Sequence, residues 1–236
     1  MHRRYSNKKL KIKRTLLVAF SFLFFCSIFW VFAYKFIDPP FTSLMLIKYF
    51  KAPGDSRRIV KKWKDLDEIS KNVVIATIAS EDQKFMEHHG FDFDAINDSI
   101  LQYEDRGGFR GASTISQQTA KNVFLFPSRS WIRKGLESYF TVLIETMWSK
   151  KRIIEVYLNV AEYGRGIYGV EAASNIYFHK HAKNLTQTEA AYLASLLPNP
   201  VIYSRNYSEN LVKRQRWIIR QMNNLGGASY LSSLYE

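Results

Sequence analysis

The sequence predicts a mainly α-helical exported domain attached to one N-terminal transmembrane helix. Three observations support this fold class. Residues 15–34 form an uncharged, mostly apolar run. Residues 38–236 are numerous enough for one domain with a sizeable core. In that part apolar residues recur at intervals of three and four, the period of an α-helix, and no convincing run of alternating apolar and polar residues indicates a strand.

The apolar run has the length of a membrane anchor. As a helix rising about 1.5 Å per residue, residues 15–34 span roughly 30 Å, the hydrocarbon thickness of a bilayer. A signal peptide has a shorter apolar region, about 7–15 residues, and a small-residue cleavage site. Residues 32–35 are a poor cleavage site, and Trp30 and Tyr34 stand where amphipathic rings settle at a membrane interface. We expect an uncleaved transmembrane anchor at residues 15–37.

Positive charge is concentrated before the anchor. The chain has 34 basic and 21 acidic residues, a formal charge of +13, and residues 1–14 hold seven of the basic residues and no acid. Such an arm could bind nucleic acid, but the adjoining apolar run favours a membrane. Because flanking Lys and Arg stay cytoplasmic, residues 1–14 are expected to be a cytoplasmic arm. The single cysteine, Cys26, lies in the predicted span, so the exported part depends on its core rather than on disulfides.

Residues 38–56 are interpreted as a membrane-proximal segment, followed by the main domain at residues 57–236. Prolines at 39 and 40 end the membrane helix. Residues 41–50 are apolar but too short to cross a bilayer, so they form a core helix or an interfacial segment. Their place directly after the anchor favours the interfacial alternative. The basic residues at 57–64 are either a solvated face or a surface attracted to anionic headgroups.

Local patterns place the remaining elements. Helical periodicity over residues 96–103, 132–147 and 153–161 predicts amphipathic helices. Thr186 and Glu189 form a capping box at the start of another helix, which ends at Pro198. Residues 103–110 include two adjacent glycines and several charges, which predict a mobile flap.

Two adjacent carboxylates follow a strongly apolar stretch. Glu81 and Asp82 come just after residues 73–79, where a buried helix emerges. Partial desolvation there raises the pKa of a carboxyl and tunes it as a base. A Glu-Asp pair beyond a core helix is more often a solvated helix end, so this stretch alone does not establish a site.

Three further clusters carry polar side chains or glycines. Residues 110–122 are a glycine loop leading into a helix start, where free backbone N–H groups and Lys121 suit an anion, although an ordinary capped helix has the same pattern. Arg133, Lys134 and Glu137 are three and four residues apart and can meet on one helix face, although a surface ion pair is the simpler interpretation. The glycines of residues 164–169 indicate close backbone approach rather than catalysis.

Five motifs occur in a fixed order. They are Glu81-Asp82-x-x-Phe85-x-x-His88-x-Gly90, Gly111-x-Ser113-Thr114-Ile115-x-Gln117-Gln118-x-x-Lys121-Asn122, Arg133-Lys134-x-x-Glu137, Lys150-x-x-Ile153-Ile154-Glu155-x-Tyr157-Leu158-Asn159 and Gly164-x-Gly166-Ile167-Tyr168-Gly169-Val170. Over residues 57–204 the chain strongly resembles the bacterial peptidoglycan glycosyltransferases in their monofunctional, membrane-anchored form. Ile154, where leucine is more usual, is a conservative departure.

The resemblance implies a lysozyme-like helical glycosyltransferase domain with lipid II, a disaccharide-pentapeptide on undecaprenyl diphosphate, as substrate. The enzyme would join a sugar hydroxyl of one lipid II to the anomeric carbon of the growing chain, releasing the diphosphate lipid with inversion. The implied location is the bacterial inner membrane, single-pass, with a periplasmic catalytic domain. The implied partners are lipid II, the growing glycan strand and the lipid bilayer, with other cell-wall synthesis or division proteins as a further class, and no nucleic acid.

Larger relatives also cross-link glycan with a transpeptidase domain that carries Ser-x-x-Lys and Lys-Thr-Gly motifs. Here the only Ser-x-x-Lys is at residues 6–9 in the basic arm, and Lys-Thr-Gly does not occur. We expect polymerisation without cross-linking.

The resemblance also assigns roles. Glu81 is the expected base, contributing about 10²–10⁴-fold, because a sugar hydroxyl is a weak nucleophile. The leaving diphosphate needs positive charge, expected from Lys121, Arg129, Arg133 and Lys134. Glu137, the second predicted catalytic residue, orients these cations, binds a metal or contacts the donor sugar. The remaining predicted substrate contacts are Asp82, Phe85, His88, Gly111, Ser113, Thr114, Gln117, Gln118 and Asn122. For Asp82 and His88 the alternative is that they only hold Glu81 in place. No organic cofactor is expected; a divalent cation, Mg or Mn, at the diphosphate with Glu137 or Asp82 as ligand is left open.

Two other functions remain as alternatives. A membrane-anchored muramidase or lytic transglycosylase also uses paired carboxylates, and it would shorten a preformed glycan. The cations beside Glu137 argue against it. An anchored module that merely binds cell-wall glycan would be indifferent to the substitution Glu81→Gln.

Overall fold

The computed structural model describes residues 2–106, 112–128, 130–206 and 208–235. The chain divides into two units, residues 1–37 and 38–236. The first consists of helix α1 (His2–Tyr34). The stretch Lys11–Tyr34 has a mean hydropathy of 2.5 and is long and apolar enough to cross a membrane. Phe20, Phe22 and Phe25 are each about two-thirds exposed, which is typical of a helix whose solvent is lipid. One N-terminal apolar helix is therefore present, as the sequence predicts.

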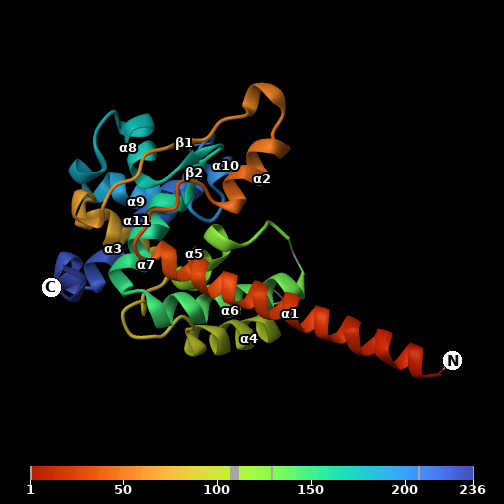
Figure 1. Ribbon diagram of the computed structural model, residues 1–236. Coiled ribbons are helices and arrows are strands. Elements are labelled where there is room, and N and C mark those ends of the chain that lie inside the picture. The colour runs from red at the N-terminus through yellow and green to blue at the C-terminus, as the bar shows by residue number, and fades with distance from the viewer. Residues whose placement is uncertain (1, 107–111, 129, 207, 236) are drawn as a thin grey trace. The chain divides into compact units, whose positions relative to one another are not determined.

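The second unit is mainly α-helical, which confirms the predicted class (Figure 1). Its α-helices are α2 (Ser43–Lys51), α3 (Lys71–Glu81), α4 (Phe93–Arg106), α5 (Ile115–Phe124), α6 (Trp131–Met147), α7 (Lys150–Val160), α8 (Val170–Phe178), α9 (Gln187–Leu196), α10 (Pro200–Tyr203), α11 (Glu209–Asn224) and α12 (Ser232–Tyr235). Short 3₁₀ turns lie at Gly54–Ser56, Leu66–Glu68, Ala182–Asn184 and Gly227–Leu231.

A small sheet, which the sequence did not predict, joins distant parts of the unit. Strand β3 (Ile167–Tyr168) lies between β1 (Val60–Lys61) and β2 (Glu162–Gly164). It is parallel to β1 and antiparallel to β2. Strands of two or three residues are too short to show an alternating pattern, so only the folded chain reveals them.

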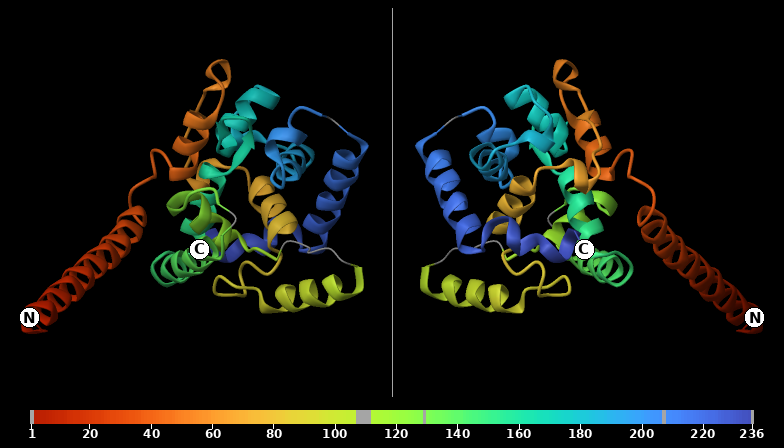
Figure 2. Two further views of the ribbon diagram at one scale, coloured as in Figure 1. Left: turned by 90° about the vertical axis from the view of Figure 1, so that its right-hand side faces the viewer. Right: turned by 90° about the vertical axis from the view of Figure 1, so that its left-hand side faces the viewer.

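Helix α3 forms the centre of the core. All residues from Val73 to Ala79 are buried, so the helix is surrounded by protein on every side. It packs against α9 and α11, while α5 packs against α6 and α7. Figure 2 shows α3, α9 and α11 lying together, with the α5–α7 group beside them. The core thus holds the end of α3 in a fixed place next to α5.

Helix starts follow the expected chemistry. The capping box of Thr186 and Glu189 is present at α9, and Thr114 and Gln117 form a second one at α5. Residues 103–106 form the last turn of α4, and the rest of the predicted flap lies outside the described residues.

Helix α2 combines both alternatives considered for residues 41–50. Met45 is fully buried and the helix packs against α5, whereas Leu46 and Phe50 are exposed. The segment is therefore part of the domain and also presents apolar side chains to its surroundings.

Candidate active site

Two carboxylates lie at the end of the buried helix α3. Glu81 is its last residue and Asp82 its C-cap. The side chain of Glu81 is only 12% exposed. Burial raises the pKa of Glu81, and three neighbours oppose that rise: Gln118 by a hydrogen bond, and Arg214 and Lys121 by their charge.

Glu81 is held by partners from two other helices. Gln118 on α5 donates from Nε2 to Glu81 Oε2 at 3.0 Å. Arg214 on α11 donates from Nη2 to Oε1 at 3.3 Å. The Gln118 carbonyl in turn accepts from the buried Tyr157 hydroxyl at 3.2 Å. The Glu81 carboxylate is therefore oriented from both sides and partly desolvated, as a general base requires.

Asp82 instead connects elements of the fold. Its Oδ2 accepts from the backbone N–H of Ile115 at 2.9 Å, and its Oδ1 lies 2.8 Å from His88 Nε2. The Gly90 N–H donates to His88 Nδ1, so a neutral His88 ring carries its proton on Nε2 and donates it to Asp82. Asp82 thereby ties the end of α3 to the start of α5.

Several other predicted contact residues also have partners within the fold. Phe85 is fully buried, with Lys150 Nζ 4.6 Å from its ring centre. Thr114 donates to the Gly90 carbonyl at 2.7 Å and shares the capping box with Gln117. These side chains shape the wall of the site from inside the protein.

The predicted cation cluster forms on one turn of α6. Glu137 is 3% exposed and pairs with both Arg133 and Lys134. Lys121 faces this group from α5. Burial lowers the pKa of Lys121, while the charge of Glu137 raises it. The pKa of Lys121 is lowered on balance, and the charge of Glu137 opposes that fall.

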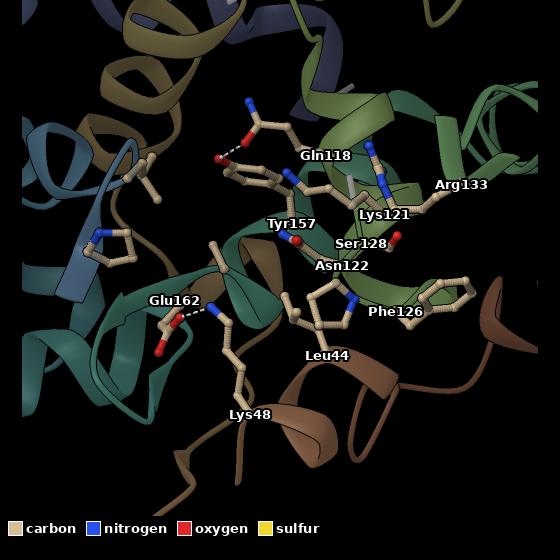
Figure 3. A pocket seen from close by; sticks show the side chains of 14 residues that line it. Leu44, Lys48, Gln118, Lys121, Asn122, Phe126, Ser128, Arg133, Tyr157 and Glu162 are labelled. Atoms are coloured by element: carbon tan, nitrogen blue, oxygen red, sulfur yellow. Dashed lines mark hydrogen bonds and ion pairs between the residues drawn. The ribbon is translucent and has the colours of Figure 1, made fainter. Parts of the chain in front are cut away.

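A cleft of about 320 Å³ is lined by two of these cations, Lys121 and Arg133 (Figure 3). Lys121, Asn122 and Arg133 line it together with Gln118, the partner of Glu81. Lys48 and Glu162 also line it and form an ion pair with each other. The cleft is suited to an anionic group.

A second cavity of about 360 Å³ lies at Glu81 itself. Ser113, Thr114 and Trp217 line it, together with the acidic side chains of Glu81, Asp82, Asp92, Asp94 and Asp98. The hydrogen bond between Glu81 and Gln118 joins the two cavities, because Glu81 lines one and Gln118 lines the other. Glu81 thus lines a cavity with more acids than bases, and its partner Gln118 lines the cleft that holds Lys121 and Arg133.

The structure brings most of the predicted residues together, except that Gly111 and Arg129 lie outside the described residues. It adds Arg214, Lys48 and Glu162, which sequence reasoning missed. Arg214 is 133 residues from Glu81, and no local spacing links the two. Tyr157 stood in a recognised motif, but its contact with Gln118 was not foreseen.

The carboxylates proposed as metal ligands do not fit a resident divalent cation. Both oxygens of Glu137 are paired with cations, and both oxygens of Asp82 have hydrogen-bond partners. Within the described ranges, no three His, Cys, Asp or Glu side chains converge to hold a metal.

A desolvated carboxylate beside a cationic cleft defines a site for transferring a group from an anionic donor.

Comparison with known proteins supports this class of reaction. A family model described as transglycosylase matches residues 48–223. The biosynthetic peptidoglycan transglycosylase of Haemophilus influenzae is 54% identical over 219 residues, covering 89% of each chain. That of Mannheimia succiniciproducens is 52% identical, covering 86% of this chain and 84% of its own. That of Klebsiella oxytoca is 48% identical, covering 97% and 96%. The chain belongs to the transglycosylase family, as its motifs predict.

Proposed function

We propose that this protein polymerises peptidoglycan glycan strands from lipid II and releases undecaprenyl diphosphate. The observation that carries the proposal is Glu81, a buried carboxylate placed where an acidic cavity meets a cationic cleft. The names of the relatives support the same reaction. A muramidase would also use a carboxylate, but it would have no need of a cluster of cations for a leaving diphosphate.

In the proposed step, a sugar hydroxyl of lipid II occupies the cavity at Glu81. Glu81 takes the hydroxyl proton as the oxygen bonds to the anomeric carbon of the growing strand. The bond from that carbon to the diphosphate oxygen breaks, and the oxygen keeps the electron pair. Lys121, Arg133 and Lys134 stabilise the charge that develops there. Attack opposite the leaving group inverts the anomeric carbon.

The role proposed for Glu137 is to hold the cations. Its two oxygens are occupied by Arg133 and Lys134, and its charge opposes the fall that burial causes in the pKa of Lys121.

The location proposed for the protein is the bacterial inner membrane, with the N-terminus in the cytoplasm and the catalytic unit outside. One apolar helix supports a single-pass anchor, and the basic residues before it favour this orientation. An association with other cell-wall synthesis or division proteins stays a prediction from family resemblance.

The test uses the full-length protein in detergent with labelled lipid II, and the products are separated on a gel. Wild type should make long glycan and Glu81→Gln should make none detectable. Glu87→Gln, an exposed acid six residues away, is the matched control and should polymerise normally. Shortening of preformed glycan without polymer from lipid II would replace the proposal with a hydrolase. Polymer from Glu81→Gln would keep the reaction but move the base elsewhere.

A further inference from the structure

A second cationic cavity lies beside the turn between β2 and β3. It has a volume of about 380 Å³ and shares no lining residue with the two cavities at Glu81. Arg58, Arg165 and Arg205 line it, together with the hydroxyl groups of Ser56 and Ser204. Tyr177 also lines it, but its hydroxyl donates to the Tyr163 carbonyl at 2.9 Å. No carboxylate belongs to the lining that the structure describes. The cavity therefore offers many hydrogen-bond donors and a concentrated positive charge.

The fold itself brings two of these arginines together. Val60 N donates to the Gly166 carbonyl at 2.8 Å, and Arg58 Nε donates to the Arg165 carbonyl at 2.9 Å. Gly166 has a φ of +69°, and a Cβ there would lie 2.4 Å from the Arg58 carbonyl oxygen. Only glycine allows this close approach. Strand pairing, rather than an acidic partner, thus holds Arg58 against the turn that carries Arg165.

Among the described residues, no ion pair is formed by Arg58, Arg165 or Arg205. The arginine ion pairs in the described ranges belong to Arg133, Arg152 and Arg214, outside the cluster. Arg165 Nε is buried without a hydrogen-bond partner. A buried donor in this state calls for an acceptor that the chain does not supply.

Glu162, three residues before Arg165, is already engaged. Its Oε2 accepts a hydrogen bond from Lys48. Its Oε1 accepts one from the Gly166 N–H at 3.1 Å. It lines the catalytic cleft and accepts a hydrogen bond from the turn. Glu162 is thus committed to other partners rather than to the three arginines.

We propose that this cavity binds a phosphate-ester oxyanion, with the headgroup of an anionic phospholipid as its source. Guanidinium groups match phosphate because their planar donors can contact two oxygens at once. Three such groups with hydroxyls between them suit a tetrahedral anion better than a two-oxygen carboxylate. The site goes beyond the polymerase reaction, since it is separate from both cavities at Glu81.

The surroundings favour a lipid over a soluble phosphate. A neighbouring cavity of about 230 Å³ shares Ser56, Arg58 and Arg165 and is lined by Tyr49 of α2. On α2, the next residue, Phe50, is 70% exposed. Tyr49 and Phe50 on α2 thus lie near the two adjacent arginines, Arg58 and Arg165. This arrangement suits a ligand that is anionic at one end and apolar at the other.

Phosphorus NMR titrations of the full-length protein in a neutral detergent test the site. The probes are dihexanoyl phosphatidylglycerol, inorganic phosphate and dihexanoyl phosphatidylcholine, with acetate at equal ionic strength as the salt control. The triple variant Arg58→Gln/Arg165→Gln/Arg205→Gln should bind phosphatidylglycerol about tenfold or more weakly. The variant Lys183→Gln/Arg216→Gln/Arg220→Gln removes the same charge from exposed positions and should bind like wild type.

The probes also distinguish the two sources of phosphate. Tighter binding of phosphatidylglycerol than of inorganic phosphate supports the lipid headgroup, and equal affinities support an oxyanion site filled from solution. Equal affinity of wild type and the triple variant for phosphatidylglycerol would overturn the site. So would a wild type that binds neither phosphatidylglycerol nor inorganic phosphate at millimolar concentration. Lipid II polymerisation and the melting temperature show that each variant is folded, and Arg205→Gln alone repeats the test should the triple variant unfold.

Discussion

Arg214 and Glu81 are 133 residues apart in sequence, yet the guanidinium Nη2 lies 3.3 Å from the carboxylate Oε1. The charge of Arg214 lowers the pKa of Glu81 against the rise caused by burial. A base must be ionised before it can accept a proton, so this contact extends the pH range in which Glu81 is active.

Replacing Arg214 should therefore shift the pH dependence of polymerisation. In Arg214→Gln the pKa of Glu81 rises further, so the acid limb of the rate profile moves to higher pH. The rate should fall most at the acid end of the pH range and recover partly as the pH rises. Arg214→Lys keeps the positive charge, so its acid limb should move less than that of Arg214→Gln. The exposed Arg216→Gln on the same helix should behave like wild type. An unchanged acid limb in Arg214→Gln would show that the contact does not tune the base.

Replacing Glu137 should change the alkaline limb of the pH–rate profile of polymerisation. The charge of Glu137 raises the pKa of Lys121, so Glu137→Gln lowers that pKa and lets Lys121 lose its proton at lower pH. The alkaline limb should therefore move to lower pH. The value of kcat should also fall by about 10–100-fold, because the charge that develops on the leaving group is stabilised less. Steady-state rates across the pH range measure both effects. Glu209→Gln, an exposed acid on α11, is the control; a loss confined to KM would point to ground-state binding instead.

Asp82→Asn should reduce stability as well as activity. The carboxylate accepts from Ile115 N and His88 Nε2, and an amide presents its own N–H₂ to one of these donors. Leaving a buried donor unpaired costs about 1–3 kcal/mol, so the melting temperature should fall by several degrees. Thermal unfolding in detergent measures this, with the exposed Asp65→Asn as control. Full stability combined with lost activity would mean that Asp82 acts in the reaction rather than in the fold.

Glu171 should contribute stability that depends on pH. Burial raises the pKa of this fully buried acid, but hydrogen bonds from Ala182 N–H and His181 outweigh burial and lower it to about 2. Lys62 also faces it, at 3.5 Å. Because the folded pKa is below the unfolded value, the stabilisation is present above about pH 4.5 and is lost as pH falls towards 2.

The comparison of wild type with Glu171→Gln checks this sign. At pH 7 the variant should be less stable by up to about 3 kcal/mol, and the difference should shrink between pH 5 and the acid limit near pH 2. Urea unfolding at several pH values measures it. Glu189→Gln, at an exposed helix start, should show a smaller change. A difference independent of pH would mean that packing, not charge, explains the effect.

Local patterns predicted the parts of this protein that depend on neighbours in sequence. The end of an apolar run placed Glu81 correctly at a helix end, and spacing of three and four predicted the pairing of Arg133 and Lys134 with Glu137. Long-range partners could not be predicted this way. Arg214 reaches Glu81 only because α11 packs on α3.

The same limit explains the small sheet and the arginine cavity. Strand β1 pairs with β3 across more than a hundred residues, and strands so short leave no periodic pattern. The glycine motif at 164–169 indicated close backbone approach, but its neighbour, Arg58, was visible only as one of several basic residues. Which charges converge depends on the tertiary fold.

The hydrogen bonds of Asp82 determine how well the catalytic base is aligned before the substrate binds. Asp82 fastens the last turn of the helix that carries Glu81 to the first turn of the helix that carries Gln118. The base and its partner are therefore aligned when the chain folds, before any ligand arrives. Preorganisation of this kind removes reorganisation from the chemical step, so the free energy of substrate binding is left for aligning two large lipid-linked sugars.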